Sequence, residues 1–238
     1  MKKIAILLIC ALCLNAENLA INALKKGYNA KIIGQYALIN GEKIMLNLGD
    51  NPPLKTRQDE GCQNSASIMA MMSANSYSAL AGLNAPLDDS TRCRNYELLG
   101  AVYGKSEAEV RANLVKVDFL GHMVEFNKNN GASKALQEVA NELKTLVQNN
   151  PEFAKFLQNI GGTFKWRKIA GTNQLSAHSY AIAVDINVKY SSYWRWSKSY
   201  KNQIPQAIVH AFERHKFIWG GRWKHFDTMH FEYRPEYF

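Results

Sequence analysis

The stretch Ser176–Asn187 reads SAHSYAIAVDIN and determines how the C-terminal half of the chain can fold. His178 comes just before an apolar run, and Asp185 lies within that run. Side chains alternate between the two faces of a strand, so Asp185 shares a face with small alanines while Val184 and the isoleucines take the other. A carboxylate in such surroundings is costly unless it is paired or bound to a metal. The pattern therefore predicts a partner for Asp185, and His178 is the natural one.

A second stretch, His225–Tyr233, reads HFDTMHFEY. Alternation places His230 and Glu232 on one face, with Asp227 on the other unless a turn reorients it. Two histidines and one carboxylate form a familiar zinc set that leaves a fourth position for water. Such a site also needs a general base that does not bind the metal, and Asp227 is the best candidate. Spacing alone leaves open that these histidines form no metal site. Four of the six histidines follow residue 209, and some of them must be surface or satisfied core residues.

The two motifs together resemble a known family. Ser176-x-His178-x6-Asp185, followed some forty-five residues later by Asp227-x-x-His230, is similar to the motif pair of the VanY-like zinc peptidases. These are D-alanyl-D-alanine carboxypeptidases and L-alanyl-D-glutamate endopeptidases of cell-wall metabolism, related in fold to the hedgehog signalling domain. The resemblance covers roughly residues 110–238. It implies that His178, Asp185 and His230 bind Zn²⁺ and that Asp227 takes the proton of the attacking water.

The resemblance also suggests roles for three other residues. His225 falls where some members carry a histidine that steadies the tetrahedral intermediate. Arg167 corresponds to an arginine that holds the substrate, because a guanidinium can grip a carboxylate or carbonyl oxygen; a solvated strand residue is the alternative. Ser176 either hydrogen-bonds near the metal or the substrate, or is a simple turn residue.

Two departures from the family pattern stand out. Many members have glycine where this chain has Ala181, and we expect a methyl group to be tolerated there in a strand. Members with the strict dipeptidase pattern carry glutamate as the base. Asp227 therefore favours the branch with endopeptidases and larger-substrate carboxypeptidases.

Periodicity predicts an α+β fold, with a small antiparallel sheet flanked by helices. The family resemblance implies the hedgehog/D-Ala-D-Ala-peptidase form of that fold. Asn40-Gly41 is a strong hairpin signal, and Ser106 with Glu109 forms a capping box. Expected strands cover residues 31–33, 36–39, 44–46, 115–119, 124–126, 163–169, 181–188 and 228–233. Expected helices cover residues 65–83, 106–114, 133–147 and 205–215.

The N-terminus predicts export. Lys2 and Lys3 precede an apolar run, Ile4–Leu14, and Ala16 is a plausible cleavage site, which is the layout of a signal peptide. The run is shorter than the roughly 20 residues of a membrane-spanning helix; a buried N-terminal helix is the alternative. We divide the chain into a signal peptide (1–16), an N-terminal strand-and-helix region (17–110) and a zinc peptidase domain (111–238). The expected location is periplasmic or secreted.

Composition agrees with an exported globular protein. The formal net charge is +9, which suits an anionic partner such as the cell wall, and export argues against nucleic acid. Only Cys62 and Cys93 remain beyond the predicted signal peptide; in an oxidising compartment they can pair, or they stay separate buried thiols. An aromatic cluster between residues 190 and 200 forms either a cleft wall that stacks on sugars or a packing loop.

We therefore expect a zinc-dependent peptidase that hydrolyses the stem peptides of peptidoglycan, foremost a D-alanyl-D-alanine-type carboxypeptidase. An L-alanyl-D-glutamate endopeptidase and a non-catalytic wall-binding protein on the same fold are the alternatives. A monomer without a membrane anchor is the working assumption. The sequence leaves open the bond that is cut, the oligomeric state, the role of residues 17–110, and which divalent ion binds.

Overall fold

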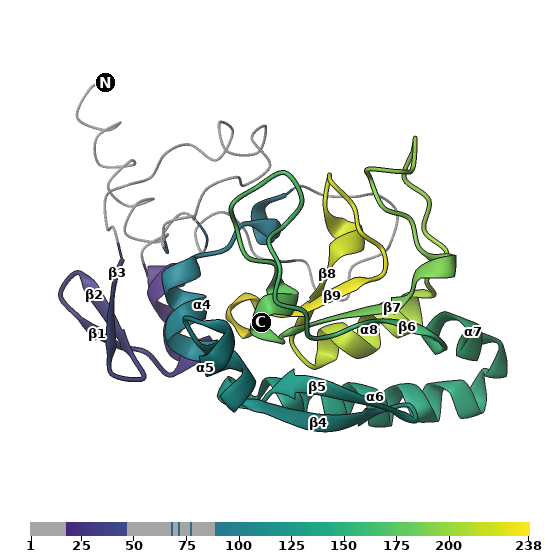
Figure 1. Ribbon diagram of the computed structural model, residues 1–238, viewed down its shortest axis with the longest axis horizontal. Coiled ribbons are helices and arrows are strands. Elements are labelled where there is room, and N and C mark those ends of the chain that lie inside the picture. The colour runs from purple at the N-terminus through teal and green to yellow at the C-terminus, as the bar shows by residue number, and fades with distance from the viewer. Residues whose placement is uncertain (1–17, 47–67, 69–70, 72–76, 78–88) are drawn as a thin grey trace, which may run out of the picture.

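A computed structural model of the chain describes residues 18–46, 68, 71, 77 and 89–238 (Figure 1). The predicted signal peptide and most of the helix expected over residues 65–83 lie outside these residues. Within the described part, no helix is both long and apolar enough to cross a membrane. The fold is α+β, with three small antiparallel sheets and helices packed against them, so the predicted fold class is confirmed.

The N-terminal region begins with helical residues 18–28, a helix that the sequence patterns did not predict. A three-stranded sheet follows, formed by β1 (Lys31–Ile33), β2 (Tyr36–Ile39) and β3 (Glu42–Met45) in the order β1-β2-β3. The turn between β2 and β3 is Asn40-Gly41, with φ angles of 51° and 84°. Both positions need positive φ in this hairpin, which is why Asn-Gly marked it correctly.

The middle of the chain follows its predicted pattern closely. Helices α4 (Tyr96–Tyr103) and α5 (Glu107–Ala112) precede a hairpin of β4 (Leu114–Phe119) and β5 (His122–Asn127). Ser106 caps α5 by accepting a hydrogen bond from the backbone N–H of Glu109. The long helix α6 (Ala132–Asn149) then lays its apolar face on the hairpin, and the short α7 (Ala154–Leu157) follows it.

The central sheet carries the two motifs. It has four antiparallel strands in the order β6-β7-β9-β8, where β6 is Ile160–Gly162, β7 is Ala183–Asn187, β8 is Phe217–Trp219 and β9 is His230–Tyr233. Residues 163–169 were expected as a strand, which is wrong: only Lys168 forms a bridge there, with Leu175. This segment instead leads into a loop that returns to the sheet at His178.

One face of the central sheet is covered by helices and the other by loops. Helix α8 (Gln206–Arg214) packs beneath the sheet, with Phe212 stacked on Phe231 of β9 at a ring distance of 3.8 Å. Figure 1 shows α8 and α6 on this side, while the loops before His178 and after β7 rise on the opposite side. Because Phe231 faces α8, its neighbours His230 and Glu232 face the loops.

Several short 3-10 turns connect these elements: η1 (Ser90–Arg92), η2 (Asn129–Gly131), η3 (Pro151–Phe153), η4 (Ala177–Tyr180), η5 (Val188–Tyr190), η6 (Gly220–Arg222) and η7 (Pro235–Tyr237). Two of them matter for the site. Turn η4 carries His178, and η1 opens a segment, residues 89–95, that reaches the loop side of the sheet.

The N-terminal region shares its core with the central sheet. A single cluster of buried apolar side chains includes Leu24, Ile39 and Leu98 from the N-terminal region and Val184 and Phe231 from the sheet. Buried polar contacts join the same parts, such as the hydrogen bond from the Tyr28 hydroxyl to Glu236 (2.6 Å). The predicted boundary at residue 110 stays a prediction, but it does not divide the core.

Candidate metal centre

Two of the expected ligands face each other across neighbouring strands. Asp185 on β7 is the register partner of His230 on β9, which brings their side chains to the same face. Asp185 Oδ1 lies 3.0 Å from His230 Nδ1. The His230 side chain is only 8% exposed and that of Asp185 is 20% exposed, so both are mostly buried while Asp185 keeps some contact with solvent.

The third expected ligand arrives on turn η4. The Ser176 hydroxyl caps this turn by accepting a hydrogen bond from the backbone N–H of His178 (3.4 Å). His178 Nδ1 lies 2.6 Å from the carbonyl oxygen of Thr163, a contact in which Nδ1–H donates. In the neutral imidazole ring, Nε2 then carries the lone pair, and it lies 3.2 Å from Asp185 Oδ2. A backbone acceptor that fixes the far nitrogen is the arrangement found behind metal-binding histidines.

Turn η4 ends at Ala181, and this corrects one expectation. Ala181 is not in a strand but has φ = 53° and ψ = 44°, the left-handed conformation that favours glycine. Its carbonyl oxygen accepts a hydrogen bond from the backbone N–H of Asn127 (2.9 Å), and its own N–H bonds the carbonyl of His178. The methyl group is therefore held in a strained backbone, which a glycine at this position would avoid.

Replacing Ala181 with glycine should change the free energy of unfolding by less than about 1 kcal/mol, because relief of the left-handed strain offsets the lost methyl burial. The matched control is Ala183→Gly in β7, also fully buried. It should cost about 1–2 kcal/mol, since a strand gains nothing from glycine. Urea unfolding of both variants measures this. Equal losses would contradict the strain at Ala181.

The three residues meet the geometric requirement of a cation site. One ligand atom from each of His178, Asp185 and His230 lies within 4.8 Å of the others. His178 Nε2 is buried and makes no hydrogen bond, so its lone pair is unsatisfied by protein groups. Such an orphaned acceptor beside a carboxylate and a second imidazole fits a divalent ion.

Electrostatics in the cluster point the same way. Burial alone would raise the pKa of Asp185, but the charge and hydrogen bonds of His178 and His230 hold it well below its usual range. Burial would lower the pKa of His230, yet hydrogen bonds to Asp185 and Glu232 outweigh it and raise that pKa to about 9. The metal-free protein therefore holds a proton on His230 at neutral pH.

Binding of Zn²⁺ to the metal-free protein should release at least one proton per chain near pH 7, because a ligating imidazole must be neutral. The apparent affinity should then rise with pH until the pKa of His230, about 9, is passed. Calorimetric titration of Zn²⁺ in two buffers of different ionisation enthalpy measures the released protons. A binding enthalpy that does not depend on the buffer would contradict this.

Asp227 lies where the strand alternation breaks. Its carbonyl oxygen accepts a hydrogen bond from the N–H of His230 (3.2 Å), which closes a turn just before β9. The turn brings Asp227 to the pocket that the expected ligands line. Asp227 Oδ1 is enclosed and has no hydrogen-bond partner. Burial and then the nearby Asp185 carboxylate raise the pKa of Asp227 to about 7. A carboxylate with that pKa is suited to accept a proton at neutral pH.

His225 is held by a residue that the sequence motifs did not include. Asp89 accepts hydrogen bonds from His225 Nδ1 and from its backbone N–H (3.0 Å). The ring also contacts Trp194, with centroids 4.5 Å apart. Asp89 is 1% exposed, so this is a buried carboxylate that fixes the imidazole, with His225 lining the same pocket as Asp227.

The pocket brings together every site residue expected from the sequence. His178, Asp185 and His230 line it together with Asp227, His225, Arg167 and Ser176. The Arg167 side chain is largely exposed, and its backbone N–H bonds the hydroxyl of Ser179 (2.9 Å). Ser176 caps turn η4, as expected for a turn residue. It also lines the pocket, as expected for a residue near the metal or the substrate.

Glu232 supports the site from behind. It is fully buried and lies 3.4 Å from His230 Nε2. Arg94 binds its two carboxylate oxygens at 2.8 and 2.5 Å, and Arg234 adds a contact of 3.2 Å. Burial alone would raise the pKa of Glu232, but Arg94 holds it well below its usual range. Glu232 is thus a permanent anion that orients the imidazole of His230.

Sequence reasoning missed the contribution of residues 89–95. This segment supplies Asp89 to His225 and Arg94 to Glu232, and Arg92 also lines the pocket. Cys93, between the two arginines, is disulfide-bonded; its expected partner, Cys62, lies outside the described residues. The only sequence signal for this contribution is the group of charged residues around Cys93. Because that group has no fixed spacing to the two motifs, the sequence could not place it at the site.

Comparison with known proteins agrees with the geometry. Residues 170–233 match the family model described as D-alanyl-D-alanine carboxypeptidase, a segment that contains all three expected ligands and Asp227. The resemblance drawn from the motifs is therefore confirmed over this narrower segment. No curated protein and no solved structure gave a match. The match and the His-Asp-His cluster support a metallopeptidase of the D-alanyl-D-alanine carboxypeptidase type that acts on peptidoglycan.

Proposed function

We propose that this protein is a zinc-dependent peptidase that removes the terminal D-alanine from peptidoglycan stem peptides. The observation that carries the proposal is the convergence of His178, Asp185 and His230 beside Asp227, whose enclosed Oδ1 has no hydrogen-bond partner. All four lie in the segment that matches the carboxypeptidase family model.

The residues suggest a division of labour for amide hydrolysis. A bound zinc ion would acidify a coordinated water and polarise the scissile carbonyl. Asp227, with a pKa near neutrality in the metal-free protein, accepts the proton of the attacking water and passes it to the leaving amine. His225, oriented by Asp89, donates a hydrogen bond to the oxygen of the tetrahedral intermediate.

Two arginines at the pocket suit an anionic substrate. Arg167 and Arg92 come from separate segments, and both line the pocket. A guanidinium recognises a carboxylate through paired hydrogen bonds, so a peptide with a free C-terminal carboxylate fits this pocket. This favours a bond with a free carboxylate beside it, as at the terminal D-alanine of a stem peptide.

Export to the periplasm or beyond is part of the proposal. Its supports are the charged and apolar layout of residues 1–16 and the oxidised state of Cys93, which fits an oxidising compartment. Peptidoglycan lies in that compartment, and a net charge of +7, which remains without Lys2 and Lys3 of the signal peptide, suits an anionic wall.

The test uses two synthetic stem peptides that end in D-Ala-D-Ala, one with a free carboxylate and one amidated. We expect release of one D-alanine from the free acid, loss of activity with a chelator, and recovery with Zn²⁺. His178→Ala is the matched inactive control. Cleavage between L-alanine and D-glutamate, equal for both peptides, would instead establish the endopeptidase. No cleavage by metal-loaded protein would support the non-catalytic wall-binding alternative.

A further inference from the structure

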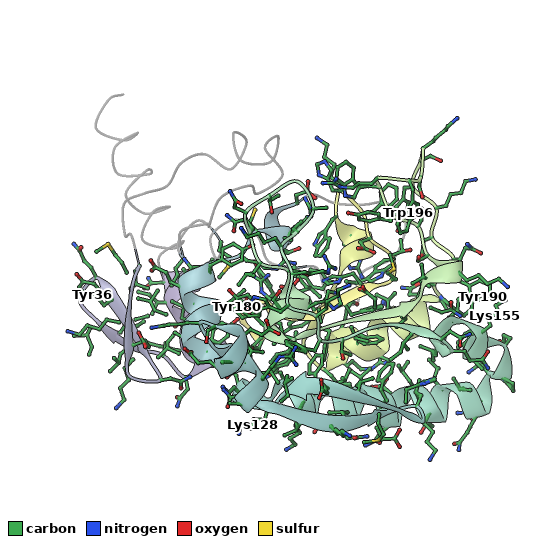
Figure 2. The ribbon with its side chains drawn as sticks, viewed as in Figure 1. Tyr36, Lys128, Lys155, Tyr180, Tyr190 and Trp196 are labelled. Carbon is green, nitrogen blue, oxygen red and sulfur yellow. The ribbon has the colours of Figure 1, made fainter. Side chains whose placement is uncertain are left out.

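One aromatic side chain beside the site is placed in solvent. Trp196 is 63% exposed, whereas Trp219 and Trp223 are almost fully buried. Figure 2 shows Trp196 on the loop side of the central sheet, well away from the helix-covered face. The indole of Trp196 is therefore accessible to a ligand, and its flat apolar face is suited to ring stacking.

The loop around Trp196 is tied down by hydrogen bonds. The backbone N–H groups of Trp196 and Ser197 both bond the carbonyl of Tyr193, at 3.1 and 2.9 Å. The Ser192 and Ser197 hydroxyls bond each other (2.9 Å). Arg195 reaches across to the carbonyl of Ala170 on the facing loop (2.7 Å). The turn therefore presents the indole in a defined position.

The exposed ring continues into the pocket. Trp196 contacts Tyr193 edge-on, with centroids 4.8 Å apart, and Tyr193 lines the pocket with the expected metal ligands. Tyr193 also forms a backbone bridge with Asp227. We refer to Trp196 and Tyr193 as the aromatic platform. It joins the exposed indole to the pocket that Asp227 also lines.

We infer that the aromatic platform binds the glycan strand of peptidoglycan, so that the attached stem peptide reaches the pocket. This inference rests on the proposed function. The C–H face of a pyranose ring is apolar and packs on an aromatic ring, while its hydroxyl groups stay in water. Stem peptides project from the glycan, so a sugar on Trp196 and a stem terminus near Asp227 are parts of one substrate.

A nucleic-acid base also stacks on aromatic rings, and Lys198 and Lys201 lie close in sequence. Arg195, the preceding residue in the chain, donates a hydrogen bond to the Ala170 carbonyl and lies 4.9 Å from the Trp194 ring centre. An uncharged sugar is therefore the better occupant. The two ligands differ in salt dependence, because only nucleic acid binding would fall steeply with salt.

The experiment compares the full-length exported protein with Trp196→Ala, Trp196→Phe and Tyr36→Ala. Tyr36 is 39% exposed at the opposite end of the molecule and serves as the matched control (Figure 2). The probes are peptide-free glycan strands, a single-stranded DNA oligonucleotide, intact sacculi and the soluble stem peptide. Binding is measured at two salt concentrations, and hydrolysis is measured on sacculi and on the soluble peptide.

We expect Trp196→Ala to bind glycan strands and to hydrolyse sacculi about tenfold less well, the loss of one ring-stacking contact. Trp196→Phe should keep most of both, and Tyr36→Ala should equal the parent. Hydrolysis of the soluble peptide should not change. Unaltered glycan binding by Trp196→Ala, or tighter and salt-sensitive binding to DNA, would overturn the inference. Failure of the parent to cleave the soluble peptide would refute the proposed function and leave the glycan result to stand separately.

Discussion

Replacement of Asp227 by asparagine should reduce peptide hydrolysis by about 10²- to 10⁴-fold while the protein still binds one divalent ion. Asparagine keeps the shape of the side chain but cannot accept the proton of the attacking water. Metal binding should persist, because the three clustered ligand residues are intact. Hydrolysis of the stem peptide and metal content per chain measure the two effects.

Glu125→Gln, an exposed carboxylate on β5, is the control and should leave both quantities unchanged. A variant at position 227 that lost its metal would show that Asp227 is a ligand. Retained hydrolysis would show that another group accepts the proton.

The same substitution should stabilise the metal-free protein at alkaline pH. The folded pKa of Asp227 is about 7, raised from 3.8, so the folded state holds a proton that the unfolded state releases. The associated stability is fully present below pH 4 and is lost as the pH rises through 7. Asp227→Asn removes this loss, which is on the order of a few kcal/mol because one pKa unit corresponds to about 1.4 kcal/mol. Urea unfolding with chelator should show the difference from the parent widening between pH 5 and pH 8. A constant difference would contradict the raised pKa.

The second large effect is expected at Arg94. Arg94→Met should destabilise the fold by about 3–5 kcal/mol, because it leaves the fully buried Glu232 without its main partner. It should also weaken Zn²⁺ binding by about 10- to 100-fold, since Glu232 orients the imidazole of His230. Urea unfolding and competition with a chelating dye measure the two quantities.

Two further variants test whether the effect of Arg94→Met comes from burial of the ion pair and from the unpaired charge of Glu232. Arg111→Met removes an exposed partner of Glu107 on α5 and should cost less than about 1 kcal/mol. Arg94→Met combined with Glu232→Gln should recover part of the stability, because no buried charge is left unpaired, but should not restore Zn²⁺ affinity. Full Zn²⁺ affinity in Arg94→Met would contradict the role of Arg94 in holding the site.

Local patterns predicted much of this fold correctly. The Asn40-Gly41 turn, the Ser106 cap and the helix from residue 133 each rest on rules that act within a few residues. The need of Asp185 for a polar partner followed from the same reasoning, whereas His230 joined the expected ligand set through the family resemblance. The turn at Asp227 was expected as a break in alternation, and the structure contains it.

The remaining features depend on contacts between distant segments. Asp89 reaches His225 across 136 residues, and Arg94 reaches Glu232 across 138, and no local period encodes such pairings. The expectation for Ala181 was wrong because strand periodicity ignores the 3-10 turn that precedes β7. Residues 163–169 have strand-like composition, but only Lys168 forms a β-bridge, with Leu175. The segment runs alongside turn η4 instead, where the Thr163 carbonyl contacts His178 Nδ1.

The central claim is that His178, Asp185 and His230 hold a zinc ion with which Asp227 cleaves stem peptides. The most direct measurement is mass analysis of muropeptides from sacculi incubated with the parent protein and with Asp227→Asn, each with and without a chelator. The account predicts loss of one terminal alanine from the stems with the parent alone, abolished by the chelator and absent with the variant. Muropeptides left unchanged by parent protein that carries bound zinc would contradict it.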